Sequence, residues 1–315
     1  MTNLTGDSEI LQRDLRAPTL LPRRSRSRFG VVAPWYFIVP ALVIYLFIEV
    51  IPSFQGVLYS FTDWDGFSRD LGFVGTANYA RVFESGPAGE AFRNTFLLAL
   101  GVTLIQNTVG LLLALGLNSK LVRSRNLLRV IFFTPVVLTP LVTGYIWNYL
   151  LTPQGTVNSF LDAIGLDALT RTWLGDPSTA LAAVGVAIIW QFSGYSMVIY
   201  LAGLQAIPQE LYESSALDGA SALQRFWYVV RPLLNGAFVI NFVLTLIGSL
   251  GQFDHVMAMT GGGPGNSTQT ISTVIYQQGV VQSQYGYAVA MSVLMTGMVA
   301  VLAVVQYRVI QRRVS

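Results

Sequence analysis

Two apolar stretches of the chain carry uncharged polar side chains at helical spacing. Gln191 and Tyr195 are four residues apart, and Thr245, Ser249 and Gln252 follow one another at intervals of four and three residues. In an α-helix each of these two sets lies on one face. Amide and hydroxyl groups in hydrocarbon need hydrogen-bond partners, and a neutral, hydroxyl-rich solute satisfies them better than an ion does. We predict that the two faces meet and bind such a solute; hydrogen bonds between neighbouring helices are the alternative.

The composition identifies the medium around these helices. The chain has 315 residues, of which 53% are hydrophobic and 11% are charged, whereas soluble domains have about a quarter of charged residues. The chain is therefore predicted to be a membrane protein. It has no cysteine and one histidine, which excludes disulfide frameworks, thiolate catalysis and zinc sites built from Cys and His. We predict neither a catalytic site nor a metal site.

The apolar residues are grouped in stretches long enough to cross a membrane, which takes about 20 helical residues. The sequence predicts an all-α polytopic membrane domain over residues 29–313, preceded by a disordered basic tail over residues 1–28. Six transmembrane helices are expected, at about 29–54, 94–117, 127–151, 180–204, 233–254 and 285–307.

Arginines are concentrated on one side of this predicted topology. They cluster before residue 29, in the turn at 118–126 and after residue 307, whereas acidic residues dominate the connections on the other side. By the positive-inside rule both termini are cytoplasmic. The net charge of +3 is thus explained by topology and requires no nucleic-acid partner. The tail directs insertion, with binding to anionic membrane lipid as the alternative.

The sequence also restricts the energy source. It lacks the phosphate-binding loop G-x-x-x-x-G-K-[ST], and its single lysine, Lys120, has no glycine-rich surroundings. No cofactor is therefore predicted in this chain, and ATP with Mg²⁺ is expected on a separate ATPase. Acidic residues inside the predicted spans are limited to Glu49 and Asp254, both near span ends, where they reach the membrane interface. An ion-coupled secondary carrier is therefore the weaker alternative.

The segment 205–232 is long and patterned for a cytoplasmic connection. Pro208 is placed to begin a helix, and Gly219 to break it before a second helix that contains Phe226. We predict a helix-turn-helix elbow on the membrane surface, which either grips the ATPase or packs on the ends of the spans.

Three motifs resemble those of one family. Glu213-Ser-Ser-Ala-Leu-Asp218-Gly219-Ala220, with Phe226 and Pro232 downstream, resembles the E-A-A-x-x-D-G-A…F…L-P signature of permease subunits of binding-protein-dependent ABC importers. The run from Phe253 to Pro264 looks like F-D-x-x-x-x-x-T-G-G-G-P of their carbohydrate-importing branch. The run Ser60-Phe61-Thr62-Asp63-Trp64, after Ile51-Pro52-Ser53, is similar to Y-P…S-F-T-D-W. A permease of the same superfamily for a non-carbohydrate solute is the alternative.

The resemblance implies an assembly in the prokaryotic plasma (inner) membrane. In such importers two six-helix permeases form the pore, two ATP-binding cassette subunits bind from the cytoplasm, and an extracellular solute-binding protein delivers the sugar. The chain is then one permease, without an ATPase site of its own. The glycine-rich loop that ends at Pro264 is expected to be flexible and to meet the solute-binding protein.

The resemblance also assigns roles to the elbow and to the polar faces. Glu213 is expected to contact the ATPase, Gly219 to form the turn and Asp218 to cap the second helix. Ala216 and Ala220 are small and are expected to allow the elbow to seat closely. Together with Phe226 they complete the set of residues expected to couple the elbow to the ATPase. In maltose-type permeases the positions that match the two polar faces line the sugar site.

Two residues are not explained by these roles. Arg231 replaces a leucine of the family pattern and is expected to bind lipid phosphate or the partner. His255 is interpreted as a hydrogen-bonded imidazole at the membrane interface, since neither a second histidine nor a nucleophile motif accompanies it.

Overall fold

The computed structural model describes residues 35–68, 70–84, 86–119 and 122–311. In these ranges the chain is built from helices, and the one strand-like pairing is an isolated antiparallel bridge between Thr62 and Phe73. The predicted tail 1–28 lies outside the described residues. The chain divides into two units, residues 1–52 and 53–315.

The first unit contains the start of one apolar helical run. The run continues to Tyr59, because Pro40 lies in the first turn of α2, where its missing N–H costs no hydrogen bond, and Pro52 lies in the first turn of α3. The sequence predicts this span at 29–54, whereas the helical run ends five residues later, at Tyr59. The elements are η1 (Trp35–Phe37), α2 (Val39–Tyr45), η2 (Leu46–Val50) and α3 (Ile51–Tyr59).

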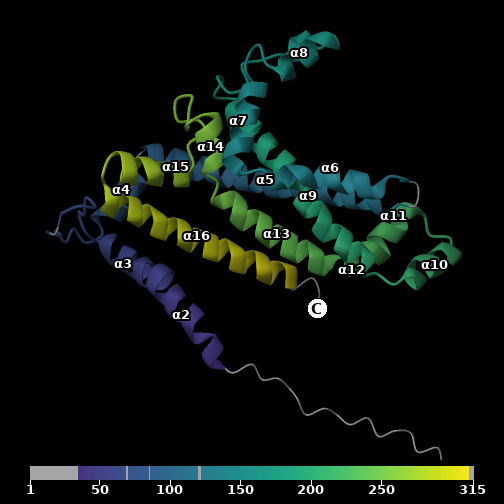
Figure 1. The fold of residues 1–315 in the computed structure, drawn as a ribbon, viewed down its shortest axis with the longest axis horizontal. Helices are drawn as coiled ribbons and strands as arrows, with labels where there is room; N and C mark the ends of the chain where they lie inside the picture. Colours follow the sequence, from purple (N-terminus) through teal and green to yellow (C-terminus); the bar gives the residue numbers. More distant parts are fainter. Residues whose placement is uncertain (1–34, 69, 85, 120–121, 312–315) are drawn as a thin grey trace, which may run out of the picture. The chain divides into compact units, whose positions relative to one another are not determined.

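The second unit contains most of the helices (Figure 1). They are α4 (Ala77–Glu84), α5 (Gly86–Asn118), α6 (Arg125–Val137), α7 (Pro140–Leu150), α8 (Thr156–Ala163), η3 (Asp167–Leu169), α9 (Ala180–Gln205), α10 (Gln209–Leu217), α11 (Ala222–Arg225), η4 (Phe226–Val230), α12 (Arg231–Leu233), α13 (Asn235–Leu250), α14 (Asp254–Met259), α15 (Ile271–Tyr276), η5 (Gln277–Val281) and α16 (Tyr285–Gln311).

Four helices of the described residues are long and apolar enough to cross a membrane, and six are if each of two bent helix pairs counts as one span. The prediction of an all-α multi-span membrane protein is confirmed. The four continuous candidates are Val39–Tyr59, Gly86–Asn118, Ala180–Gln205 and Tyr285–Arg308.

The third predicted span is not one helix. The sequence predicts a continuous helix over 127–151, but α6 and α7 meet at an angle of 100°. Leu138 and Thr139 are extended, each with ψ of 146°, because the ring of Pro140 disfavours helical backbone in the preceding residue. Pro140 then opens α7, and Thr139 caps it by accepting a hydrogen bond from the Val142 N–H.

The fifth predicted span is bent as well. It begins earlier than residue 233, because the helical run Ala222–Leu233 leads into α13 at an angle of 71°. The elbow is therefore joined to α13 through η4 and α12 without an intervening loop.

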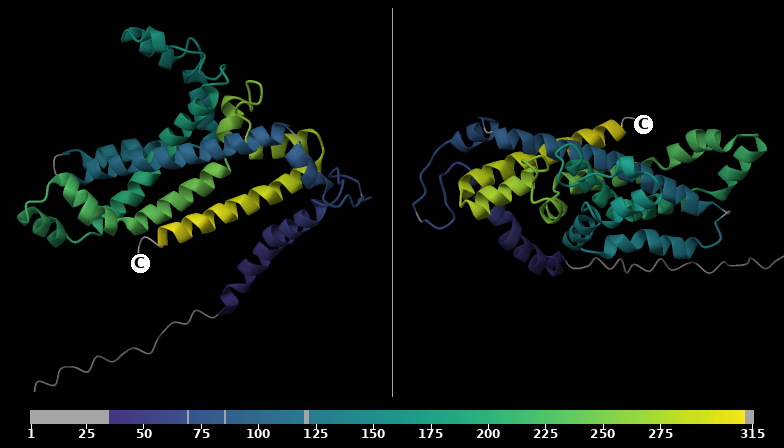
Figure 2. Two further views of the ribbon diagram at one scale, coloured as in Figure 1. Left: turned by 180° about the vertical axis from the view of Figure 1, so that it is seen from behind. Right: turned by 90° about the horizontal axis from the view of Figure 1, so that it is seen from above.

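The long helices pack along one another in the second unit. α5 lies along α9, α13 packs against α5, α9 and α16, and α6 packs against α9. Figures 1 and 2 show that α10 and α11 lie at one end of these helices, whereas α4, α14 and α15 lie at the other.

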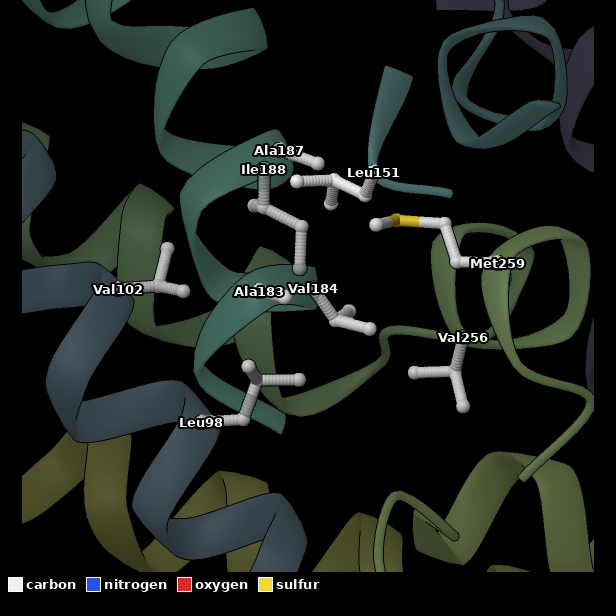
Figure 3. Packing of buried hydrophobic residues seen from close by; sticks show 9 residues of the cluster. All are labelled: Leu98, Val102, Leu151, Ala183, Val184, Ala187, Ile188, Val256 and Met259. Atoms are coloured by element: carbon white, nitrogen blue, oxygen red, sulfur yellow. The ribbon is translucent and has the colours of Figure 1, made fainter. Parts of the chain in front are cut away.

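A buried apolar cluster holds α5, α9 and α14 together. Its α9 face is rich in alanine, which allows the neighbouring helices to approach. Figure 3 shows the side chains converging from these helices and from the end of α7. The cluster comprises Leu98, Val102, Leu151, Ala183, Val184, Ala187, Ile188, Val256 and Met259.

Two glycines mark where helices nearly touch. A Cβ atom on Gly194 of α9 would overlap the Phe132 carbonyl oxygen of α6. A Cβ atom on Gly110 of α5 would lie 2.5 Å from the Ser196 Cβ atom of α9. Since Cβ atoms do not approach so closely, only glycine permits these packing distances.

The predicted motif Ser60–Trp64 has a structural role. The hydroxyl groups of Ser60 and Tyr79 lie 2.7 Å apart, and Asp63 accepts a hydrogen bond of 2.8 Å from the Gly72 N–H. The Trp64 carbonyl accepts a bond of 2.9 Å from the Gly286 N–H at the start of α16. The motif thus ties the connection after α3 to α4 and α16.

Candidate functional site

A cavity of about 370 Å³ lies among α5, α6, α9 and α13. Such a volume is within the range of about 300–1,000 Å³ for small-molecule sites. Its walls include four of the five residues that the sequence predicts as solute contacts, and none of its ten lining residues is charged. The lining residues are Gln106, Val136, Ile188, Phe192, Tyr195, Leu244, Thr245, Gly248, Ser249 and Gln252.

The polar groups of the cavity come from facing helices. Tyr195 lies on α9, whereas Thr245 and Ser249 lie on α13 and Gln252 follows this helix. Tyr195 from one polar face and all three residues of the other therefore line one cavity. Thr245 donates a hydrogen bond of 2.7 Å to the Asn241 carbonyl, which leaves the lone pairs of its hydroxyl oxygen available as acceptors.

Gln191, the fifth predicted contact, is not among the lining residues. It is fully buried, and its Nε2 donates a hydrogen bond of 2.7 Å to the Leu138 carbonyl. This carbonyl belongs to the break between α6 and α7, where regular helical bonding is interrupted. The structure therefore places Gln191 as a support for the break.

His255 lies beside Gln191 in the interior. Its Nε2 is 2.7 Å from Gln191 Oε1 and its Nδ1 is 3.1 Å from Gln252 Oε1. Its ring packs edge-on against Phe192. The predicted hydrogen bonding is present, and the side chain is fully buried, because α14 folds back against α7.

The cavity wall also includes residues that lie outside the two predicted polar faces. Gln106 of α5 donates hydrogen bonds of 2.9 Å to Ser196 Oγ and 3.2 Å to the Phe192 carbonyl. The sequence feature that points to Gln106 is its side-chain amide in the middle of an apolar stretch. Apolar wall residues such as Phe192 carry no signal that distinguishes them from lipid-facing residues.

The elbow is the second candidate site, at the opposite end of α13 from Gln252. α10 ends before Gly219, whose φ of +73° favours glycine and reverses the chain. The Ser221 hydroxyl caps α11 by accepting from the Gln224 N–H, and the Gln224 side chain accepts from the Ser221 N–H. The predicted capping role of Asp218 is thus corrected: Asp218 is at the C-terminal cap of α10, too far upstream to cap α11.

Other elbow residues differ in their exposure. Ser215 is the buried residue of α10, whereas Ala216 is exposed and Ala220 is half-buried. Ser215 therefore faces the rest of the chain, whereas Ala216, about 100° further round the helix, faces away from it. Phe226 packs inward against the apolar cluster at the end of α9, so it anchors the elbow to the spans.

The outer surface of the elbow combines a carboxylate with exposed apolar side chains. Glu213 is exposed, Leu217 is 89% exposed and Leu223 is 68% exposed. Tyr212 faces inward, and its burial raises the pKa of its hydroxyl. An exposed leucine on a polar segment is typical of a surface that another protein covers.

Comparison with known proteins shows the family. Residues 106–315 match the family described as binding-protein-dependent transport system inner membrane component. A probable ABC transporter permease protein of Bacillus subtilis, YurN, is 37% identical over 88% of this chain and 95% of its own. The chain belongs to this permease family. The multiple sugar-binding transport system permease protein MsmF of Streptococcus mutans is 32% identical over 87% of the permease and 93% of its own chain.

The fold agrees with this assignment. The crystal structure of a bacterial ABC transporter that imports alginate superposes with a TM-score of 0.76, 23% identity and coverage of 88% of the permease and 94% of that chain. The family predicted from the three motifs is confirmed. The permease is an inner membrane component of a transport system with several membrane helices.

The glycine-rich loop of the permease folds back on itself. Gly261 and Gly262 adopt positive φ, and the Thr260 and Thr268 hydroxyl groups lie 2.7 Å apart. Arg231, the departure from the family pattern, places its guanidinium over the Trp227 ring at 5.2 Å. This cation–π contact lies within the elbow and gives Arg231 an intramolecular partner.

Proposed function

We propose that the permease forms half of the pore of an ATP-driven importer for a neutral sugar, a disaccharide, an oligosaccharide or a related polyol. The uncharged polar cavity between α9 and α13 carries this proposal. Hydroxyl groups of a sugar both donate and accept hydrogen bonds, as the amides and hydroxyls on the walls do. The name of the relative MsmF supports the same solute class.

Two features of the permease indicate its partners. Its sequence lacks a phosphate-binding loop, and its elbow exposes apolar side chains. We infer that a second permease completes the pore, that two ATP-binding cassette subunits bind ATP and Mg²⁺, and that an extracellular solute-binding protein delivers the sugar. The permease itself hydrolyses no ATP. The elbow and both termini face the cytoplasm, which the distribution of arginines along the sequence supports.

Coupling has a direct mechanical route in this arrangement. α10 follows α9 closely, and α11 continues into α13 through η4 and α12. Both helices that flank the elbow also line the cavity. Movement of the elbow when the ATPases close therefore shifts α9 and α13 together and alters access to the cavity, as in rigid-body alternating access.

Uptake by the assembled transporter in proteoliposomes tests the solute class. Radiolabelled glucose, lactose and maltotriose are offered with the solute-binding protein and internal ATP, beside sn-glycerol 3-phosphate and methionine as charged and zwitterionic solutes. We expect ATP-dependent uptake of a neutral sugar. Uptake of only a charged or zwitterionic solute, or uptake driven by an ion gradient without ATP, would contradict the proposal.

Substitutions then test the cavity. Tyr195→Ala and Gln252→Ala are expected to raise the sugar concentration for half-maximal uptake about tenfold or more, because each removes a polar wall group. Tyr145→Ala and Gln205→Ala remove exposed side chains outside the cavity and should change it less than about twofold. Unchanged uptake at limiting sugar in both cavity variants would refute the assignment.

A further inference from the structure

Four polar groups connect the break between α6 and α7 to the cavity wall. The Leu138 carbonyl accepts from Gln191 Nε2 over 2.7 Å, and Gln191 Oε1 lies 2.7 Å from His255 Nε2. His255 Nδ1 lies 3.1 Å from the Gln252 side-chain amide. Gln191 and His255 are fully buried, whereas Gln252 lines the cavity.

The contacts of Gln191 with Leu138 and with His255 determine which nitrogen of the His255 imidazole carries the hydrogen. A carbonyl only accepts hydrogen bonds, so the NH₂ end of the Gln191 amide faces Leu138 and the oxygen end faces His255. His255 Nε2 therefore carries the hydrogen. A charged ring is disfavoured because burial of an unpaired charge is costly, and the partners of both ring nitrogens are neutral amides that offer no compensating negative charge. In the neutral ring Nδ1 is an acceptor.

Gln252 then lies between two acceptors. One end of its amide faces His255 Nδ1, and the other end lies 3.2 Å from the Gly248 carbonyl. An amide turned by 180° exchanges oxygen and NH₂ without moving either position. If the oxygen faces Nδ1, two lone pairs oppose each other over 3.1 Å beside the fully buried ring. If NH₂ faces Nδ1, the amide oxygen lies beside Gly248, and both residues line the cavity.

We propose that His255 is a positioning residue that turns the Gln252 NH₂ group toward Nδ1, so that the Gln252 carbonyl oxygen faces the cavity beside the Gly248 carbonyl. The pair of oxygens then accepts hydrogen bonds from hydroxyl groups of the solute. His255 does not touch the solute itself. The solute part rests on the proposed function, whereas the protonation pattern of the ring does not.

Nuclear magnetic resonance tests the protonation pattern directly, because His255 is the single histidine of the sequence. The full chain, labelled with [¹⁵N]histidine and purified by a histidine-free tag, is studied in lipid nanodiscs. We expect one protonated nitrogen at Nε2 and an unprotonated, hydrogen-bonded nitrogen at Nδ1. Gln252→Leu should shift the Nδ1 signal and leave Nε2 protonated. A doubly protonated ring at neutral pH, or a ring protonated only at Nδ1, would overturn the proposal.

Two substitutions of His255 test the contact of Nδ1 with Gln252 and the contact of Nε2 with Gln191 separately. An asparagine amide lies near the position of Nδ1 and a glutamine amide near that of Nε2, so His255→Asn retains an acceptor for Gln252 and His255→Gln retains the contact with Gln191. For the neutral sugar that the parental transporter imports, we expect KM within about threefold in His255→Asn and raised roughly three- to tenfold in His255→Gln, with similar kcat. Equal KM values for both variants would reduce His255 to a space-filling residue and refute the positioning role.

The outcomes separate this inference from the proposed function. If the assembly imports no neutral sugar, the proposed function fails, and the ring nitrogen signals still decide where the Gln252 amide points. If sugar is imported but Nδ1 is protonated, the positioning role fails alone.

Discussion

The hydroxyl of Tyr200 donates a hydrogen bond of 2.6 Å to Oδ1 of Asn107, and the same oxygen accepts one of 2.8 Å from Asn241 Nδ2. All three side chains are buried, and they join α9, α5 and α13, the helices that carry most of the cavity wall. Asn107 also donates to the Thr103 carbonyl over 2.7 Å. This shared oxygen fixes the rotation of the three helices about their own axes.

The first prediction concerns this network. Tyr200→Phe should lower the free energy of unfolding by about 0.6–1.7 kcal/mol, the range for hydrogen bonds between membrane helices. Asn107→Leu should cost more, because it leaves the donors of Tyr200 and Asn241 unpaired. Thermal unfolding in lipid nanodiscs measures both, with Tyr228→Phe at an 81% exposed position as the control. A Tm of Asn107→Leu equal to the parental value would contradict the role of the network.

A second prediction concerns the contact between α9 and α6. Gly194→Ala should destabilise the permease by about 1–3 kcal/mol or separate the two helices, because the added methyl group overlaps the Phe132 carbonyl. Gly116→Ala on α5 is the matched control: nothing lies within 4 Å of its added Cβ, so helix propensity should stabilise it by up to about 1 kcal/mol. The yield of folded protein and its Tm distinguish the two variants, and equal stability would refute the close contact.

The turn of the elbow supports a third prediction. Gly219→Pro should abolish sugar uptake, since proline fixes φ near −65° whereas the turn needs +73°. Gly219→Asn should retain most uptake, because asparagine tolerates positive φ. The cavity should stay intact in both, so the solute-dependent signals of [¹⁵N]His255 should match those of the parental protein. Normal uptake by Gly219→Pro would exclude the elbow as the coupling element.

The exposed surface of the elbow supports a fourth prediction. Glu213→Ala and Leu217→Ser should each weaken co-purification of the ATPase, by roughly tenfold or more for the loss of a charge-assisted contact. Glu210→Ala, on the same helix and also exposed, is the control and should retain the ATPase. Parental amounts of bound ATPase in both Glu213→Ala and Leu217→Ser would show that this surface is not the docking surface.

Several features followed from local sequence rules. Gly219 was predicted to break the elbow because few residues other than glycine adopt positive φ easily, and its φ is positive. The polar faces followed from helical periodicity, and Tyr195 and Thr245 indeed line one cavity. The family was recognisable from motifs that start at Glu213 and Phe253, because their residue types and spacing are specific in combination.

Other features depended on contacts between distant segments. Periodicity places Gln191 and Tyr195 on one face of α9, but their side chains diverge, since α14 folds back and brings His255 to Gln191. The 100° break before Pro140 depends on a local rule about proline, yet membrane helices often accommodate proline without such a bend. The direction in which α7 turns away from α6 is supported by the hydrogen bond that Gln191 donates to the Leu138 carbonyl.

The sequence by itself determined the membrane setting, the continuous helical spans, the elbow and the family, because hydropathy, periodicity and turn chemistry act over a few neighbouring residues. Only the tertiary structure decided which polar residues face the cavity and which hold the helices together. That choice depends on the rotation of each helix about its axis. The rotation is set by close contacts such as Gly194 with Phe132 and by the shared oxygen of Asn107, between residues that are far apart in the chain.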